Sequence, residues 1–280
     1  LKLYRNAVAF PNIVARLCPA FCREACLRAA ADAPVALAEL ERACANLAGK
    51  KDPPDYHLPP KAERVAVVGG GMSGLACAIR LAEKSYQVSV YEKTSRPGGQ
   101  ARRLAGEAIF TQEFAREFQF IRYQLLLEQE IKDLGGLAAD AVYIATGKGG
   151  RDFGLLPLPD PSAPRTRLPQ VFLGGELTGA DPVTAIAQGL QAAGAIQAFL
   201  RGGGAPAQSE PKANPFPFPL EIKPLPPVIP EAADYTSEEA QAEAARCLKC
   251  DCDNCLRHCD LMTYYQRYPL KIKNEVLATF

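Results

Sequence analysis

Three glycines and one acidic residue carry the most specific chemical signal in the sequence. Gly69, Gly71 and Gly74 have the G-x-G-x-x-G spacing, directly after the apolar run RVAVV and at the start of a helical pattern. Such a turn lets a pyrophosphate meet the backbone and the free N–H groups of a helix N-terminus. Glu92 ends the next apolar run, where a carboxylate accepts hydrogen bonds from ribose hydroxyls. The pattern predicts a dinucleotide site; the alternative is a packing turn with an incidental glutamate.

A second group of reactive side chains is a cysteine cluster near the C-terminus. Its members are Cys247, Cys250, Cys252, Cys255 and Cys259. Four closely spaced thiolates can surround one iron–sulfur cubane, since soft sulfur ligands favour iron–sulfur or zinc chemistry. Structural zinc sites usually use two close pairs separated by a longer span, so the spacing favours iron–sulfur. Zinc remains the main alternative to iron–sulfur. Disulfides are less favoured because the chain is expected to be cytoplasmic, where thiols stay reduced.

Three further cysteines, Cys18, Cys22 and Cys26, follow one another at a spacing of four near the N-terminus. Three thiolates cannot complete a four-thiolate site alone, and a helical stripe of buried cysteines is the alternative. Cys44 and Cys77 fall inside predicted helices and are interpreted as packing residues. No acid–base pair or activated nucleophile can be named, so no catalytic residue is predicted.

The elements expected around these residues alternate between strands and helices. We predict strands at 64–68, 87–91 and 139–147, and a strand and turn at 171–179. Helices are expected from the glycine turn to about 84, over 112–132 with weaker character, and over 181–200. Residues 1–30 read as irregular, and a helix from about 34 to 47 is expected to be capped by Asp32. A capped helix also leads into the C-terminal cysteines.

Segments after Glu92 resemble those of flavoproteins with two dinucleotide-binding domains. KTSRPGGQ resembles the continuation in which a second glycine pair passes close to the cofactor, and ATG at 145–147 and GGELTG at 174–179 resemble two later FAD-contacting segments. The resemblance implies FAD as the dinucleotide. It adds the expected contacts Gly98, Gly99, Gln100, Thr146, Gly147, Gly175, Glu176 and Thr184. In these flavoproteins an Asp usually stands in the place of Glu176.

The cysteine segments resemble those of one family. RLCPAFCREACLRAAADAPVALAELER at 16–42 resembles the second cysteine motif of the glutamate synthase small-subunit family, shared with the N-terminal region of dihydropyrimidine dehydrogenase. EEAQAEAARCLKCDCDNCLRHC at 238–259 resembles the first motif. In the family both motifs precede the FAD domain, whereas here the first one lies at the far C-terminus. We infer that the chain returns, so that seven motif cysteines and Cys252 jointly hold two [4Fe–4S] clusters.

The same family normally carries a second dinucleotide domain, which binds NAD(P)H, between the segments that correspond to Gln100 and Val171. This chain has only 70 residues there, 101–170, and no second glycine fingerprint after a strand. A further βαβ unit would not fit beside the elements already expected. Two explanations stay open: the protein has lost nicotinamide binding, or residues are missing from this sequence.

The expected fold class is therefore α/β, with a Rossmann-like FAD-binding domain flanked by small, mainly helical, cysteine-rich iron–sulfur segments at both termini. The expected divisions are an N-terminal helical segment at 1–60, the FAD-binding domain at 61–201, a proline-rich linker at 202–231 and a C-terminal iron–sulfur segment at 232–280.

The composition argues against some kinds of binding partner. The chain of 280 residues is 48% hydrophobic, enough for a packed core, and its net charge is +1. That balance provides no broad field for nucleic acid or anionic membrane. The first residues lack the pattern of a signal peptide, and no apolar run reaches 18 residues, which predicts a cytoplasmic protein without membrane insertion.

The preferred function is electron transfer in an oxidoreductase complex, between flavin, clusters and a partner that is an iron–sulfur or catalytic subunit. A complete NAD(P)H-dependent oxidoreductase whose nicotinamide domain is absent from this sequence is one alternative. A non-catalytic structural subunit that binds FAD and zinc is the other.

Overall fold

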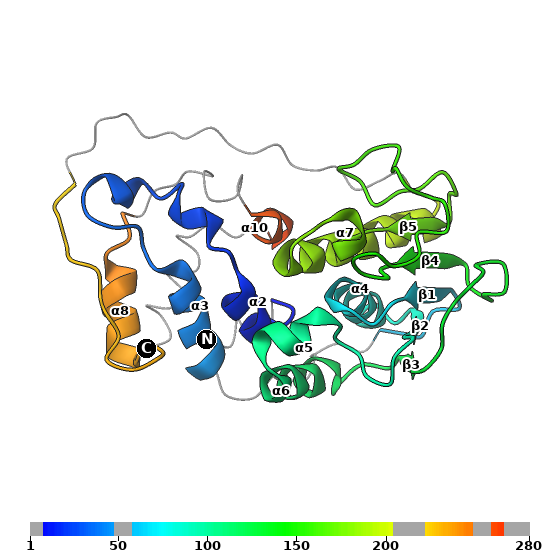
Figure 1. Ribbon diagram of the computed structural model, residues 1–280, viewed down its shortest axis with the longest axis horizontal. Helices are drawn as coiled ribbons and strands as arrows, with labels where there is room; N and C mark the ends of the chain where they lie inside the picture. The colour runs from blue at the N-terminus through cyan, green and yellow to red at the C-terminus, as the bar shows by residue number, and fades with distance from the viewer. Residues whose placement is uncertain (1–7, 48–57, 204–221, 249–258, 266–280) are drawn as a thin grey trace. The chain divides into compact units, whose positions relative to one another are not determined.

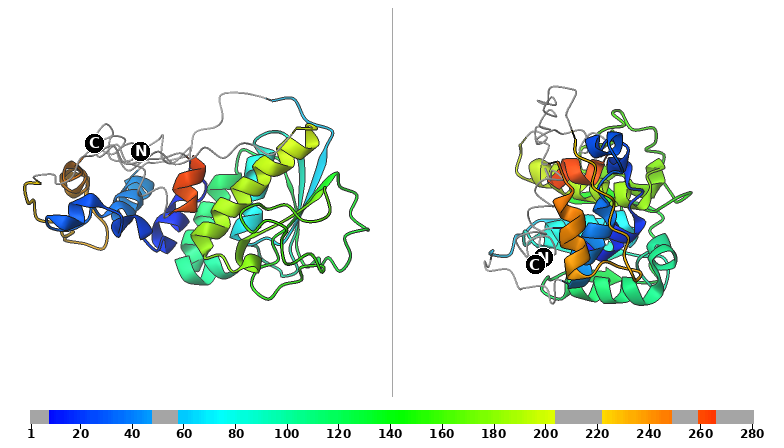
Figure 2. Two further views of the ribbon diagram at one scale, coloured as in Figure 1. Left: turned by 90° about the horizontal axis from the view of Figure 1, so that it is seen from above. Right: turned by 90° about the vertical axis from the view of Figure 1, so that its left-hand side faces the viewer.

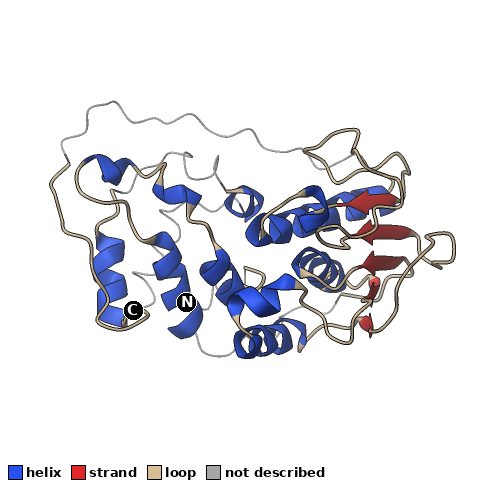
Figure 3. Ribbon diagram, viewed as in Figure 1, coloured by secondary structure: helices blue, strands red, loops and turns tan. Residues whose placement is uncertain are grey.

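The computed structural model describes residues 8–47, 58–203, 222–248 and 259–265 (Figure 1). The chain divides into two compact units, and each is described by itself. The central unit is Pro53–Gln208, and the terminal unit combines Leu1–Asp52 with Ser209–Phe280. All described strands belong to the central unit, whereas the described part of the terminal unit contains helices and loops (Figure 3).

A five-stranded parallel sheet forms the middle of the central unit. Its strands are β1 (Arg64–Val68), β2 (Gln87–Tyr91), β3 (Gln124–Leu126), β4 (Ala141–Ile144) and β5 (Val171–Leu173), in the order β3-β2-β1-β4-β5 (Figure 1). β-Branched and aromatic residues dominate these runs because they pack well on a pleated surface. The order 3-2-1-4-5 is that of a doubly wound dinucleotide-binding sheet, which confirms the predicted α/β class.

The two faces of this sheet are covered differently. The helices α4 (Met72–Ala82) and α7 (Pro182–Leu200) lie along one face (Figure 2). Val65 and Val67 of β1 and Tyr143 of β4 pack against these helices. The alternate residues Ala66 and Val68 pack instead with residues from the loops around 131–139 and 153–158. Burial on both faces explains why the strands read as continuous apolar runs.

The helix α7 is long and apolar enough to cross a membrane by length and composition alone. More than half of that stretch is buried within the structure, and the helix packs on α4 and on the sheet. Its apolar composition is therefore that of a core helix. It begins where the Asp181 Oδ1 atom accepts hydrogen bonds from the N–H groups of Val183 and Thr184, at 2.9 and 3.2 Å, and Pro182 occupies its first position.

The predicted helical character of 112–132 is wrong over its second half. Two helices, α5 (Gln100–Ala105) and α6 (Glu107–Phe118), occupy the preceding stretch, and the chain then enters the edge strand β3. This strand has three residues and pairs with β2. A short edge strand is decided by its distant neighbour, so local periodicity does not indicate it.

Helices from both ends of the chain build the terminal unit: α2 (Pro11–Leu17), α3 (Leu37–Leu47), α8 (Ser237–Ala245) and α10 (Asp260–Tyr265). Residues 1–30 were expected to be irregular, but they include α2 and two 3-10 turns, η1 (Phe21–Arg23) and η2 (Leu27–Ala30). The helix α3 packs against α2 and α8. The return of the C-terminal segment to the N-terminal one, expected from the sequence, is therefore present in the structure.

The start of α8 follows the sequence prediction of a capped helix. The Thr236 hydroxyl accepts a hydrogen bond from the Glu239 N–H at 3.2 Å, and the Glu239 carboxylate accepts one from the Thr236 N–H at 2.7 Å. This reciprocal capping box satisfies two backbone donors. It sets the start of the helix that runs toward Cys247.

Candidate dinucleotide and cysteine sites

A cavity of about 250 Å³ opens in the central unit at the carboxyl ends of β1, β2 and β4. In open α/β sheets this is the edge at which ligands bind. Eight of the residues predicted to contact the cofactor line the cavity: Gly69, Gly71, Glu92, Gly99, Gln100, Thr146, Gly147 and Glu176. The volume is slightly below the roughly 300 Å³ at which small-molecule pockets begin, so the cavity matches part of a dinucleotide.

The glycine turn between β1 and α4 combines two tight positions with one open position. Gly69 has φ +112°, and a Cβ atom there would lie 2.2 Å from the Ala145 carbonyl oxygen. At Gly74 a Cβ atom would lie 2.0 Å from the Gly69 oxygen, so both positions require glycine for packing. Gly71 lines the cavity, and a Cβ atom there would meet nothing within 4 Å.

No side chain caps the N-terminus of α4 at Gly71. The first N–H groups of a helix lack intrahelical partners, and the helix dipole favours an anion there. This end of α4 adjoins the cavity, since Gly71, Met72 and Ser73 all line it. The backbone is therefore arranged to bind a phosphate or another small anion.

Glu92 follows β2, is 8% exposed and joins the glycine turn to the loop after the strand. Its Oε2 atom accepts a hydrogen bond from the Gly70 N–H at 2.8 Å. Its Oε1 atom accepts from the Thr94 N–H at 2.9 Å and from the Thr94 hydroxyl at 2.8 Å. A carboxylate can accept about four hydrogen bonds, so capacity remains for a ribose hydroxyl.

Four predicted contacts lie beside the cavity without lining it: Gly74, Gly98, Gly175 and Thr184. The Gly98 N–H donates to the Gly70 oxygen at 2.6 Å, which joins the second glycine pair to the first turn. The Gly175 N–H donates to the Gln188 Oε1 atom at 2.7 Å. The Thr184 N–H is bound by the α7 cap. These residues shape the backbone around the cavity.

Charged residues that the motifs did not predict also line the cavity. Lys148 and Arg151 come directly after the ATG turn that follows β4, and Lys93 follows Glu92. Burial raises the pKa of Glu176, and the positive charge of Lys148 opposes that rise. The sequence could have indicated Lys148 and Arg151 as cavity residues, because both follow an expected cofactor segment. The loop residues Gln129, Glu130 and Ile131 offered no such signal.

The terminal unit contains five of the eight predicted metal ligands within the described residues: Cys18, Cys22, Cys26, Cys247 and Cys259. Cys250, Cys252 and Cys255 lie outside those residues. Cys22 is buried in a small cluster with Leu37 and Met262, and Cys259 packs against that cluster. One cysteine from each end of the chain is thereby brought to the same place.

The part of the chain that the structure describes contains no group of three or more His, Cys, Asp or Glu residues arranged to hold a metal ion. Burial raises the pKa of Cys259. Its thiol therefore needs a bound metal or a nearby positive charge before it becomes a thiolate ligand. The proposed cluster ligands stay a prediction.

The other two cysteines pack as the sequence predicted. Cys44 and Cys77 are 1% and 0% exposed. Burial raises the pKa of Cys44 to about 11, and burial also raises the pKa of Cys77. Both thiols are protonated core residues at neutral pH, and buried thiols of this kind are unreactive.

The strand order, the glycine turn and the buried glutamate define a dinucleotide-binding α/β protein. Residues 67–107 match the family model described as an NAD(P)-binding Rossmann-like domain. The chain is 33% identical over 130 residues to glutamate synthase [NADH] of Schizosaccharomyces pombe, covering 45% of this chain and 6% of the relative. It is 33% identical over 98 residues to the NAD-dependent dihydropyrimidine dehydrogenase subunit PreT of Escherichia coli, covering 34% and 24%.

A third relative is the glutamate synthase [NADPH] small chain of Bacillus subtilis, 34% identical over 92 residues that cover 32% of this chain and 19% of the relative. The chain thus spans a quarter or less of the length of these relatives. Over the matched residues it is a homologue of the glutamate synthase small subunit and of PreT, and the resemblance predicted from its motifs is confirmed.

Proposed function

We propose that this protein is a cytoplasmic, FAD- and [4Fe–4S]-containing electron-transfer subunit of an oxidoreductase complex. One observation supports the proposal above the others: cysteine segments from opposite ends of the chain lie in one unit of a protein whose other unit has a cavity at the glycine turn. The relatives that it matches are redox enzymes by name. The four divisions predicted from the sequence serve as the proposed domains.

FAD is the proposed dinucleotide. The N-terminus of α4 and Gly71 would bind the pyrophosphate, Glu92 the adenosine ribose, and Glu176 the ribityl chain. Bound flavin supplies chemistry in which electrons enter as pairs and leave singly. The residues Lys148 and Arg151 add positive charge at the same cavity, which favours an anionic cofactor.

The proposed cluster ligands are the seven motif cysteines with Cys252, held as two [4Fe–4S] clusters that supply single-electron transfer. Two of the relatives are named as a subunit or a small chain. We therefore propose a redox partner, either an iron–sulfur or a catalytic subunit, and no nucleic acid or membrane insertion.

The composition of purified protein tests this proposal. We expect anaerobically purified full-length chain to contain about one FAD, eight iron and eight acid-labile sulfide, with broad visible absorbance. Cys26→Ala should lower the iron and sulfide content by about half, since each cluster needs four ligands. Cys44→Ala is the matched control and should leave both contents unchanged, because Cys44 is a core residue.

A yellow protein that contains zinc and no sulfide would contradict the electron-transfer proposal. It would support instead the structural subunit in which FAD and zinc stabilise the fold without turnover. Protein with neither flavin nor metal would leave only an α/β fold with an unassigned cavity.

A complete NAD(P)H-dependent oxidoreductase is the second candidate, because the matched family model is described as NAD(P)-binding and the relatives are named for NADH, NADPH or NAD. Within residues 58–203, which are described without a gap, all strands form one sheet with one glycine turn. In this second candidate the nicotinamide domain is absent from the present sequence, so the intact mass of the natively expressed protein separates the two. A mass of about 30.1 kDa would favour the first proposal, and a mass larger by a further domain would favour the second.

A further inference from the structure

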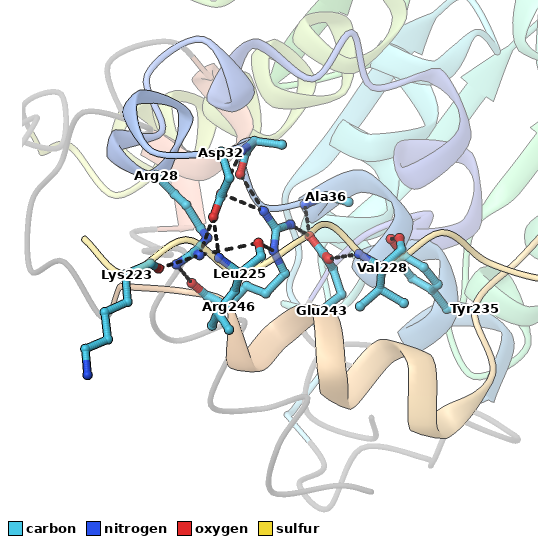
Figure 4. Close-up of polar contacts among 10 residues, drawn as sticks. Arg28, Asp32, Ala36, Lys223, Leu225, Val228, Tyr235, Glu243 and Arg246 are labelled. Atoms are coloured by element: carbon cyan, nitrogen blue, oxygen red, sulfur yellow. Dashed lines mark hydrogen bonds and ion pairs between the residues drawn. The ribbon is translucent and has the colours of Figure 1, made fainter.

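Four charged side chains, three of them buried and Asp32 partly exposed, form a network where three segments of the terminal unit meet: Arg28, Asp32, Glu243 and Arg246 (Figure 4). The first two come from the N-terminal segment and the last two from α8 and the residue after it. Two guanidinium groups oppose two carboxylates, so the group is neutral as a whole. Arg28 and Arg246 are 2% and 3% exposed, and Glu243 is fully buried.

The Arg246 guanidinium binds both ends of the chain at once. Its nitrogen atoms donate to the Glu243 Oε1 atom at 2.6 Å, the Asp32 Oδ1 atom at 2.9 Å, the Ala33 oxygen at 2.7 Å and the Leu225 oxygen at 3.1 Å. A planar fork with several donors suits such a set of fixed acceptors, and a lysine ammonium does not reproduce it. Arg246 directly precedes Cys247.

Arg28 completes the connection from the other side. Its Nη1 atom donates to the Arg246 carbonyl oxygen at 2.8 Å, and its Nη2 atom donates to Asp32 Oδ2 at 2.6 Å. The Arg246 carbonyl belongs to the peptide group whose nitrogen is that of Cys247. Arg28 itself lies two residues after Cys26. One guanidinium therefore links the backbone beside an N-terminal cysteine to the backbone beside a C-terminal cysteine.

The extended segment before α8 is held in the same network. The Leu225 N–H donates to Asp32 Oδ2 at 2.7 Å, and the Val228 N–H donates to Glu243 Oε2 at 3.0 Å. On the other side, Glu243 Oε1 accepts from the Ala36 N–H at 2.9 Å. These bonds run to backbone groups at defined positions, so a shift of one segment by one residue would break several together.

Burying three of these charges costs desolvation free energy, and apolar residues of similar size often hold segments together at least as well. In some proteins buried polar groups do select a single register, as a buried asparagine does in coiled coils. Holding the two segments together would not by itself require a network of charged groups. A fixed register would be needed if side chains from both segments had to meet at one site.

We propose that Arg28 and Arg246 are positioning residues, which with Asp32 and Glu243 fix the register of the two cysteine segments so that thiols from both meet in one metal site. The metal part of this inference rests on the proposed function, whereas the register part does not.

Disulfide trapping tests the register without a metal. Metal-free full-length chain is oxidised with diamide, and peptide mass spectrometry measures the fraction of disulfides that join Cys22 or Cys26 to Cys247 or Cys259. Arg28→Met and Arg246→Met should each lower that fraction at least fivefold relative to wild type. Arg28→Lys should recover part of it, since a lysine keeps the charge and reaches fewer acceptors.

The matched control is Arg42→Gln. Arg42 forms an ion pair with Asp234 that also joins the two ends of the chain, but both side chains are partly exposed, and the two residues are 16 and 13 positions from the nearest motif cysteines, Cys26 and Cys247. This variant should keep the wild-type fraction of cross-segment disulfides. In anaerobically purified holoprotein, Arg28→Met should also lose at least half of its iron and sulfide, while its flavin content stays at the wild-type level because the central unit is unchanged.

Wild-type disulfide fractions in both methionine variants would overturn the proposal. So would an equal loss in Arg42→Gln, because the effect would then be general destabilisation. If wild-type protein contains no iron or sulfide, the proposed function fails, and the disulfide fractions still decide the register.

Discussion

At the scale of single residues, some glycines of the turn are needed for folding and another faces the expected ligand. Gly69 and Gly74 have no room for a side chain, since a Cβ atom would collide with backbone oxygens. Gly71 has φ −75°, a value that any residue adopts, and it faces the open cavity. A change at Gly71 should therefore affect the ligand and leave the fold intact.

We predict that Gly71→Ala lowers the affinity for FAD at least tenfold, because the added methyl group occupies the place where backbone meets pyrophosphate. The free energy of unfolding should fall by about 1 kcal/mol or less, the scale of a helix N-cap change. Titration calorimetry with FAD and urea unfolding measure the two effects.

Gly136→Ala is the control, because Gly136 is exposed and a Cβ atom there meets nothing within 4 Å. It should change neither quantity. Wild-type FAD affinity in Gly71→Ala would contradict the assignment of this turn to the cofactor.

At the scale of elements, the close crossing of α4 and α7 positions the cavity. A Cβ atom at Gly189 of α7 would lie 2.1 Å from the Ser73 oxygen in the first turn of α4. The Ser73 hydroxyl forms a buried hydrogen bond of 2.7 Å with the Tyr143 hydroxyl of β4. Burial raises the pKa of Tyr143, so this phenol stays protonated. Sheet and helices thus meet just below the glycine turn.

Gly189→Ala should destabilise the central unit by about 1–3 kcal/mol. Helix propensity alone favours alanine by about 1 kcal/mol, but the clash with a backbone oxygen forces the helices apart, and overpacking costs about 1–3 kcal/mol. Urea unfolding monitored by circular dichroism gives the sign. The control Gln191→Ala, half-buried in the same helix, should change stability by less than about 1 kcal/mol. A more stable Gly189→Ala variant would show that the helices do not cross closely.

At the scale of the whole molecule, one unit is assembled from both ends of the chain, and Asp32 is part of that assembly. Burial raises the pKa of Asp32, but hydrogen bonds from the backbone N–H groups of Leu225 and Ala33 and the charge of Arg28 outweigh it. The folded-state pKa therefore lies well below the ordinary value of 3.8. Arg246 also faces this carboxylate.

A lowered folded-state pKa has a defined consequence for stability. The contribution of ionised Asp32 is fully present above pH 3.8 and is lost as the pH falls toward the folded-state value. Asp32→Asn should thus be less stable than wild type at pH 7, and the difference should shrink steadily below pH 3.8. Asp234→Asn, at the partly exposed pair with Arg42, should have a smaller effect at pH 7. A difference between Asp32→Asn and wild type that does not vary with pH would contradict the role of this carboxylate.

The amino-acid sequence alone determined the central fold up to β2, the turn at Gly69, Gly71 and Gly74, and the place of Glu92. These features are local: a buried strand, a glycine turn and a helix follow one another within about thirty residues, and each has its own pattern. The capping box of α8 and the N-cap of α7 are local for the same reason.

Only the tertiary structure decided the role of Asp32. The sequence suggested a helix cap, yet α3 begins at Leu37, and Glu243 binds the preceding Ala36 N–H while Asp32 pairs with Arg28 and Arg246. The partner Arg246 is 214 residues away. Local periodicity carries no information about such contacts, because they depend on which segments meet after the chain has folded. For the same reason, the sequence did not indicate that the loop at 129–131 lines the cavity of the central unit.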